Sequence, residues 1–283
     1  MKKWIALLLA ALLVFSLAAC SNNTPASDTA ETGEPATTED TAETAETDSA
    51  SDKAYVQEKG TLIVGITDFA PMDYQENGEW IGFDADMAKA FAESLGVEAQ
   101  FVEINWDTKA MELDSKNIDC VWNGMTLTEE TTSTMSCSNA YCNNAQVVVV
   151  KSDKAEGLDS AEACMDLNFA VESGSAGEAA AVEQGFNYIA VVTQADALTE
   201  VICNTYDACT ICLLMAGAMI GEGTNNADLV HTVELTTEEY GVGFRQGSDL
   251  TAALNEFFAA AYADGSMMAC AETYGVQDAV IAQ

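Results

Sequence analysis

The chain has 283 residues, of which 46 are acidic and 10 are basic, and its formal net charge is −36. This balance excludes nucleic acid as a partner, because binding to phosphates requires clusters of Lys and Arg that the chain lacks. The hydrophobic content of 49% is that of a globular protein, and the length allows one large domain or two small lobes.

The first 20 residues have the pattern of an export signal. Lys2 and Lys3 precede an apolar run over residues 4–17, and small residues lead to Cys20. This run is too short for a spanning helix, which needs about 20 residues, but it fits a signal peptide. The ending Leu-Ala-Ala-Cys resembles the lipobox of bacterial lipoproteins. The resemblance implies lipid attachment at Cys20 and anchoring to the outer face of the cell membrane. The alternative is an ordinary cleaved signal with an incidental cysteine.

Residues 21–52 contain no aromatic residue and no cation, and they are dominated by Thr, Ala, Glu, Ser and Asp. Such a segment cannot bury enough apolar surface to offset its conformational entropy, and its charges repel one another. The composition therefore predicts a flexible acidic tether. From Lys53 onward the composition is globular.

The next part of the chain alternates short apolar strands with amphipathic helices. Strands are predicted over residues 61–66, 97–102 and 118–122, with helices over residues 84–95 and 107–113 between them. This order predicts a parallel sheet with helices on its faces.

The remainder of the chain repeats this alternation and ends in helices. The predicted strands are 146–151, 168–172, 189–192, 208–212 and 240–244, and the predicted helices are 160–166, 176–183, 195–204, 250–263 and 267–274. The repetition predicts an α/β protein with two similar lobes. Lobe 1 would contain residues 53–145 and 240–283, and lobe 2 residues 146–239. The strands at 146–151 and 240–244 are predicted to cross between the lobes.

Eight cysteines follow Cys20, an even number that is compatible with disulfides in an exported protein. Cys137 and Cys142 flank a polar loop and are the best local pair. Cys209 and Cys212 have the spacing of a redox or metal pair, but an odd spacing on a strand places them on opposite faces. The chain has only one histidine, so we expect no metal site and no cofactor.

Several fragments, in this order and spacing, resemble the family 3 extracellular solute-binding proteins, which serve ATP-driven importers of polar amino acids. They are GTLIVG at 60–65, GFDAD at 82–86, GMTLTEE at 124–130, ESGS at 172–175, YDA at 206–208 and YGVGF at 240–244. The resemblance covers residues 58–276. It implies a type II periplasmic-binding-protein-like fold whose lobes close on a ligand at the hinge, and a membrane permease as partner. We expect a monomer without enzymatic activity.

The resemblance also implies first-lobe ligand contacts. Phe69 and Trp106 correspond to aromatic residues that sandwich the ligand, and Gly124 and Thr126 to backbone and hydroxyl contacts. These residues have structural alternatives. Large aromatic side chains usually pack in a core, and Thr126 with Glu129 has the spacing of a capping box.

In the second lobe, Ser173, Ser175 and Ala176 resemble ligand contacts at a helix start. Ser175 with Glu178 also has the spacing of a capping box. Both roles are compatible, because the first amide groups of a helix have no partner within it.

Three positions depart from the family pattern. The arginine that clamps the α-carboxylate of an amino acid is replaced by Thr131, and the aspartate that binds its ammonium group is replaced by Cys212. Glu172 stands where some members have a lysine. We therefore predict a small polar solute, an amino acid or an amino-acid-like compound. We favour a neutral or cationic solute without a free α-carboxylate, stacked between Phe69 and Trp106 with Glu172 as the counter-charge.

Two other functions remain possible from the sequence. A receptor that signals instead of delivering its ligand would need the same closure motion. An enzyme on this fold would need an acid–base pair facing a pocket, and the single His231 is better explained as a surface or capping residue.

Overall fold

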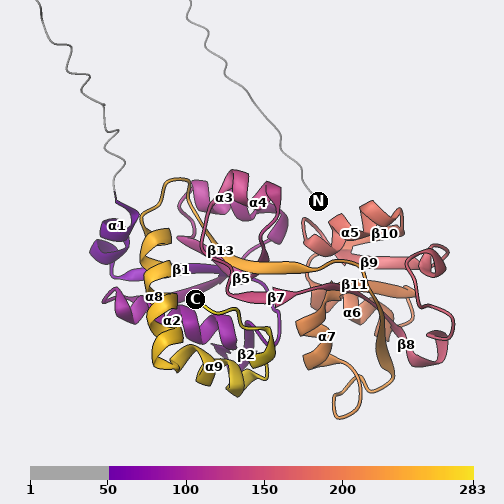
Figure 1. Cartoon of the computed structure of the whole chain (residues 1–283). Helices are drawn as coiled ribbons and strands as arrows, with labels where there is room; N and C mark the ends of the chain where they lie inside the picture. The colour runs from indigo at the N-terminus through magenta and orange to yellow at the C-terminus, as the bar shows by residue number, and fades with distance from the viewer. Residues whose placement is uncertain (1–50) are drawn as a thin grey trace, which may run out of the picture. The chain divides into compact units, whose positions relative to one another are not determined.

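The computed structural model describes residues 51–283, in which two α/β sheets form the centres of two lobes (Figure 1). The expected two-lobed α/β architecture is confirmed. The signal peptide, Cys20 and residues 21–50 lie outside the described residues. Within residues 51–283, no helix is both long and apolar enough to cross a membrane.

The first sheet combines parallel strands with one antiparallel strand that arrives from the second lobe. In spatial order its strands are β4 (Glu98–Glu103), β1 (Thr61–Ile66), β5 (Cys120–Thr126), β13 (Glu238–Phe244) and β6 (Ser136–Cys137), with β7 (Cys142–Asn144) also paired to β13. β1 is parallel to β4 and β5, and β13 is antiparallel to β5.

Helices cover both faces of this sheet. They are α1 (Asp52–Lys59), α2 (Phe83–Ser94), η1 (Trp106–Thr108), α3 (Lys109–Asp114), α4 (Glu129–Thr134), α8 (Leu250–Asp264), α9 (Ser266–Tyr274) and η4 (Gln277–Ala279). On one face, Trp122 of β5 packs between Phe91 of α2 and Phe258 of α8, with ring centroids 6.2 and 5.5 Å away. On the other face, Val121 packs with Leu113 of α3 in a separate cluster. The alternation along β5 separates these two cores.

The second sheet has the same plan. Its strands, in spatial order, are β10 (Asn187–Val191), β9 (Asn168–Glu172), β11 (Ala208–Cys212), β8 (Gln146–Lys151) and β12 (Leu229–Glu234). Its helical segments are η2 (Ser152–Lys154), η3 (Glu162–Cys164), α5 (Ala176–Gln184), α6 (Gln194–Ile202) and α7 (Leu213–Met219). β9 is parallel to β10 and β11, and β8 is antiparallel to β11.

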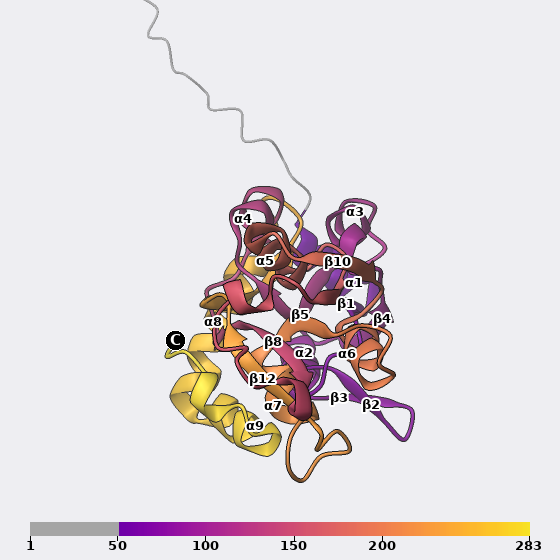
Figure 2. The same ribbon diagram turned by 90° about the vertical axis from the view of Figure 1, so that its right-hand side faces the viewer.

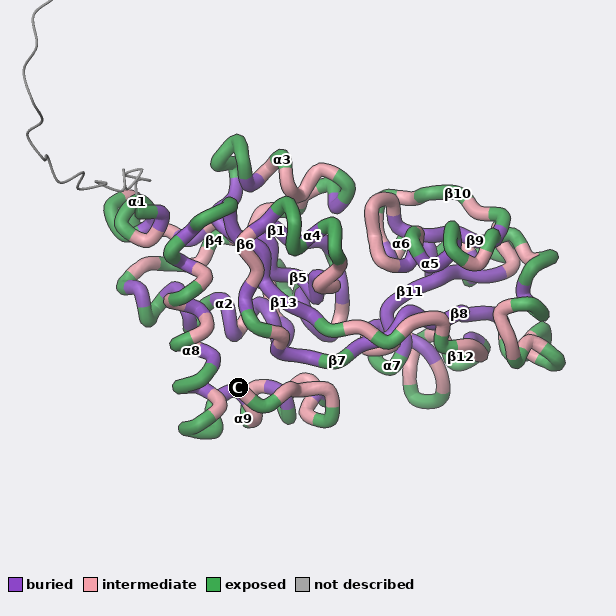
Figure 3. The backbone as a smooth tube through the Cα atoms, turned by 45° about the horizontal axis from the view of Figure 1, so that its top comes forward, coloured by how far each residue is buried: buried purple, intermediate pink, exposed green. Residues whose placement is uncertain are grey.

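The run of four valines in β8, at 147–150, follows from coverage of both faces of this sheet. Val147 and Val149 belong to the core that contains α6 residues, and Val148 and Val150 to the core that contains Ala181 of α5. Figure 2 shows α5 and α6 on different sides of the strands, and Figure 3 shows β8 and β11 as buried. Strands covered on both faces have continuous hydrophobic sequences.

In each sheet, one strand that runs antiparallel to its neighbour follows directly after the chain has crossed from the other lobe. The chain passes from β7 of the first sheet into β8 of the second through Ala145, and it returns from β12 to β13 through residues 235–237. The strands that were predicted to cross between the lobes, β8 and β13, are therefore the first strands after each crossing. The chain itself crosses in the short segments that precede them.

Some elements differ from the sequence prediction. The helix expected over 160–166 is only the 3₁₀ turn η3, and the hairpin β2 (Tyr74–Glu76) and β3 (Glu79–Ile81) was not predicted. The hairpin turns at Asn77 and Gly78, with φ of 53° and 83°. Asn-Gly is the strongest sequence signal for such a turn, so the hairpin could have been found.

The part of the chain that the structure describes contains eight free cysteines. Cys137 and Cys142, the best candidate pair, are not bonded, because they face different residues of β13, namely Gly243 and Tyr240. Cys209 and Cys212 are also free, as their spacing on β11 predicts. No group of three or more His, Cys, Asp or Glu side chains between residues 51 and 283 is arranged to hold a metal ion.

Candidate ligand-binding cleft

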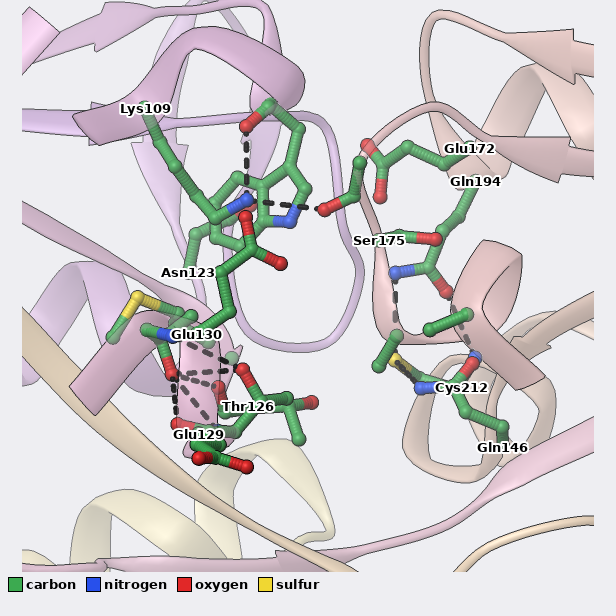
Figure 4. Close-up of a pocket in the computed structure, with 18 residues that line it drawn as sticks. Lys109, Asn123, Thr126, Glu129, Glu130, Gln146, Glu172, Ser175, Gln194 and Cys212 are labelled. Carbon is green, nitrogen blue, oxygen red and sulfur yellow. Dashed lines mark hydrogen bonds between the residues drawn. The ribbon is translucent and has the colours of Figure 1, made fainter. Parts of the chain in front are cut away.

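A cavity of about 230 Å³ lies between the two lobes (Figure 4). It is located at the carboxyl ends of β5, β9 and β11, where open α/β sheets bind their ligands. The predicted site residues that line it are Trp106, Gly124, Thr126, Thr131, Glu172, Ser175, Ala176 and Cys212. Phe69 and Ser173 do not line it.

Phe69 lies directly beneath the cleft surface. Its side chain is 1% exposed, and its ring meets that of Tyr240 edge-on at 6.3 Å. A Cβ atom at Gly124 would lie 2.4 Å from the Phe69 ring, and the φ of Gly124 is +54°. Gly124 therefore has to be glycine for the strand to pass over the ring. In this structure Phe69 supports the cleft floor as a core residue, and Trp106 is the aromatic side chain that lines the cavity.

A backbone hydrogen bond joins Ser173 to β10, the edge strand of the second sheet. Its N–H group donates to the carbonyl of Val191 at 3.0 Å. The neighbouring Ser175 and Ala176 face the cavity.

Two buried carboxyl groups hold the floor of the cleft. Asp84 accepts hydrogen bonds from the N–H group of Gly124 and from the hydroxyl of Tyr141, both at 2.7 Å. Asp73 accepts one from the side-chain amide of Asn123 at 2.8 Å. Burial raises the pKa of Asp84 to about 7, and burial together with the charge of Asp84 raises the pKa of Asp73 well above its usual range.

The structure corrects the capping box that was expected for Thr126 and Glu129. The N-cap residue of α4 is Thr128, which exchanges hydrogen bonds with Thr131, and Thr126 is the last residue of β5. The hydroxyl of Thr131 donates to the carbonyl of Thr126 at 3.0 Å. The hydroxyl of Thr131 is therefore engaged in local hydrogen bonds.

Ser175 begins the second-lobe wall of the cleft. Its hydroxyl oxygen accepts from the N–H group of Glu178 at 3.1 Å, as predicted for an N-cap. The carboxylate of Glu178 accepts from the N–H group of Gly174 at 2.7 Å. Ala176, the first residue of α5, retains an amide group that the helix does not use.

Cys212 and two glutamines form a neutral corner of the cleft. The N–H group of Cys212 donates to Gln194 Oε1 at 2.8 Å, and the side-chain amides of Gln146 and Gln194 lie 3.3 and 3.4 Å from its sulfur. Burial raises the pKa of the Cys212 thiol to about 12, so the thiol stays neutral. Gln146 and Gln194 were not predicted as site residues, because only the tertiary structure brings them to Cys212.

The cleft also contains Lys109, another residue that the sequence analysis missed. Its ammonium group lies 5.0 Å from the Trp106 ring centroid and donates to the carbonyls of Trp106 and Gly174 at 3.2 and 3.0 Å. Burial lowers its pKa, against the charges of Glu130, Glu172 and Asp107. Lys109 thus connects the first lobe to Gly174 of the second.

Carboxyl groups outnumber this cation in the cleft. Glu129, Glu130 and Glu172 line the cavity together with Lys109. Glu172 is 2% exposed, and its Oε1 atom is buried without a hydrogen-bond partner. Burial raises its pKa to about 8.

The only arginine of the sequence, Arg245, lies outside the cleft. Its side chain is buried in the first lobe, where Nε donates to Asp52 at 3.0 Å and one terminal nitrogen donates to the carbonyl of Ile118 at 2.8 Å. The other terminal nitrogen lies 3.4 Å from Asp119. Since all these contacts fix the guanidinium group, no arginine side chain is free to bind a ligand.

Comparisons with known proteins agree with this architecture. The family described as bacterial extracellular solute-binding proteins, family 3, matches residues 62–277. The arginine-binding extracellular protein ArtP of Bacillus subtilis is 28% identical over 90% of this chain and 91% of its own length. The glutamine-binding protein of Geobacillus stearothermophilus is 30% identical over 86% of this chain and 92% of its own length. The L-cystine-binding protein TcyJ of Escherichia coli (strain K12) is 29% identical over 77% and 84%.

Solved structures show the same fold. A crystal structure of an ArgBP mutant from T. maritima has a TM-score of 0.74 and 29% identity, covering 79% of this chain and 98% of its own. The ancestral amino acid-binding protein AncCDT-1, a precursor of cyclohexadienyl dehydratase, has a TM-score of 0.73 and 30% identity, covering 79% and 99%. These relatives are binding proteins. The chain belongs to the family 3 bacterial extracellular solute-binding proteins.

Proposed function

We propose that this protein is the substrate-binding lipoprotein of an ABC importer, and that its lobes close on a small amino-acid-like solute that is neutral or cationic and lacks a free α-carboxylate. The solute-binding role follows from the family. The ligand class rests on one observation, which is that the only arginine of the chain is fixed by buried contacts outside the cleft.

The α-carboxylate of an amino acid would be costly to enclose in this cleft. Enclosing a carboxylate without a compensating charge costs several kcal/mol. Thr131 is engaged locally, and Cys212 is neutral. The charge of Lys109 already faces the carboxylates of Glu130 and Asp107, and its ammonium group donates to two carbonyls. An additional carboxylate in this cleft would therefore lack a free cationic partner.

Closure would follow from contacts that a ligand makes to both lobes. Trp106 and Thr126 line the cavity from the first lobe, and Ser175 and Ala176 from the second. A ligand that contacts both walls favours the closed arrangement over the open one by population shift. In this proposal, lobe 1 contains residues 53–145 and 240–283, and lobe 2 residues 146–239.

The proposal places the protein at the outer face of the cell membrane. Lipidated Cys20 and the acidic tether after it would hold the receptor near a permease. Stable anchoring needs more than one acyl chain, which the diacyl group of a lipobox cysteine would supply. Mass spectrometry of the membrane-extracted protein should find a lipid-modified N-terminal peptide, and the Cys20→Ser variant should be released from the membrane. An unmodified Cys20 in the mature protein would contradict this part.

Calorimetry with matched pairs of compounds tests the ligand class. The pairs are arginine with agmatine, histidine with histamine, and cystine with cystamine, and a neutral diamide completes the panel. We expect an amine or the diamide to bind at least 100-fold more tightly than the amino acids. Micromolar binding of an amino acid, with no binding of the amines or the diamide, would overturn the proposed ligand class.

A further inference from the structure

Glu172 has a combination of features that a purely structural residue would not need. It ends β9, lines the cleft and is 2% exposed. Its Oε1 atom is buried without a hydrogen-bond partner. A buried polar atom without a partner costs free energy, so this oxygen remains available for a group that enters the cavity. Figure 4 shows its side chain directed into the space between the lobes.

The surroundings of Glu172 favour a cation as that group. Lys109, on α3 of the first lobe, faces Glu172, but its ammonium group donates to the carbonyls of Trp106 and Gly174. Asp196, on α6 of the second lobe, adds a second negative charge near Glu172. The side chains that offer hydrogen bonds to Glu172, those of Gln194 and Thr67, are neutral, and the amide of Gln194 also lies 3.4 Å from the sulfur of Cys212.

Resting on the proposed function, we propose that Glu172 determines the specificity of the cleft: it binds an ammonium group of the ligand as an ionised carboxylate and releases its own proton to solvent when the ligand enters. The O–H bond of the carboxylic acid breaks, water or buffer accepts the proton, and the carboxylate pairs with the ligand's N–H groups. The step involves no oxidation and no covalent bond to the ligand. The substrate class is a solute that carries a positive amine.

The sign of the pH dependence follows from burial. Burial raises the pKa of Glu172 to about 8, so the empty cleft holds a neutral carboxylic acid at pH 7. A cation favours the ionised form and lowers the pKa of Glu172 in the complex. Amine affinity should therefore rise with pH, by up to about tenfold per pH unit, and level off above about pH 8.

Titration calorimetry of the mature receptor with agmatine, histamine and cystamine tests the proposal. Each titration is run at pH 7 in phosphate and in Tris, whose ionisation enthalpies differ, so that the number of protons released can be counted. We expect release of up to one proton per bound amine by the wild type. Glu172→Gln should abolish the release, remove the rise of affinity with pH and weaken binding at least tenfold.

Two further variants distinguish ligand recognition by Glu172 from a general effect of the protein's charge and from a defect in folding. Glu183→Gln removes the same charge from an exposed position on α5, outside the cleft, and should leave proton release and affinity within about twofold of the wild type. Glu172→Asp keeps a carboxyl group on a shorter side chain and should retain proton release while binding more weakly. Circular dichroism confirms that each variant is folded.

The outcomes distinguish this proposal from the proposed function. Equal affinity and equal proton release by the wild type and Glu172→Gln would overturn the role of Glu172, while the proposed ligand class would stand. Binding of the neutral diamide, with no binding of any amine, would also overturn the role of Glu172. Failure of every probe to bind would count against that role as well. If intact amino acids bind and Glu172→Gln still removes proton release, the role of Glu172 stands and the proposed ligand class fails.

Discussion

The side-chain amide of Gln146 donates a hydrogen bond to Glu238 Oε1 at 2.7 Å, which joins the ligand cleft to the hinge. Gln146 is the first residue after one crossing between the lobes, and Glu238 is the first strand residue after the other. The same oxygen accepts from the amide of Asn144 at 2.6 Å. One carboxylate thus holds both crossing segments together.

Removal of this carboxylate should loosen the hinge. Glu238→Ala leaves the buried amides of Asn144 and Gln146 without this acceptor, so we expect a loss of about 1–3 kcal/mol in unfolding free energy. Urea denaturation measures the loss. The control is Glu239→Ala, which removes an exposed carboxylate from the same strand and should cost less than about 0.5 kcal/mol. Equal losses in the two variants would show that Glu238 is not a special hinge residue.

A methyl group at Gly174 should oppose closure of the lobes. The Cβ atom of Gly174→Ala would lie 2.7 Å from the Cα atom of Asp107 in the first lobe, and φ is +70°. Gly185→Ala is the matched control, because its φ is +73° but its Cβ atom would approach only Met165, at 3.8 Å. Both variants should lose about 1 kcal/mol of stability. Only Gly174→Ala should show a larger radius of gyration by small-angle X-ray scattering, and an unchanged radius would contradict the contact.

The buried network of Arg245 should contribute strongly to the stability of the first lobe. Arg245→Met leaves Asp52 without its ion-pair partner and Asp119 with only Lys59 as an ion-pair partner, and we expect a loss of about 3–5 kcal/mol. Lys154→Met breaks the ion pair with Asp207, at 3.5 Å and near the surface, and should cost at most about 1 kcal/mol. Chemical denaturation compares them. A loss below 1 kcal/mol for Arg245→Met would refute the structural role assigned to this arginine.

Raising the pH should destabilise the ligand-free protein. Burial raises the pKa of Glu172 from 4.5 to about 8 and that of Asp84 from 3.8 to about 7. Between about pH 4 and pH 8 the folded state therefore keeps protons that the unfolded state has lost. Stability should fall by up to about 1.4 kcal/mol per pH unit for each group.

Differential scanning calorimetry between pH 5 and pH 8 measures this trend, with salt added to screen the general charge repulsion. The double variant Glu172→Gln, Asp84→Asn should have a flatter dependence of Tm on pH, and Glu183→Gln should follow the wild type. A wild-type Tm that increases from pH 5 to pH 8 would contradict the assigned pKa directions.

The order of elements could be predicted because it depends on local patterns. The buried run of β8 and the capped start of α5 at Ser175 are visible in a few adjacent residues, and the structure has them where expected. The 3₁₀ turn η3 was predicted as a helix, since a short apolar segment does not reveal whether enough turns pack to sustain one. The location of Phe69 beneath Gly124 depends on a strand passing over the ring, which no local pattern shows.

The sequence by itself determined the two α/β repeats and the presence of a single arginine, Arg245, because strand and helix periodicity and residue identity can be read directly along the chain. Only the tertiary structure decided that Lys109 reaches Gly174 and that Gln146 lies between Cys212 and Glu238. It also decided that the Oε1 atom of Glu172 has no partner. Desolvation and hydrogen-bond satisfaction are set by residues distant in the chain, and these effects give the cleft its charge and its chemistry.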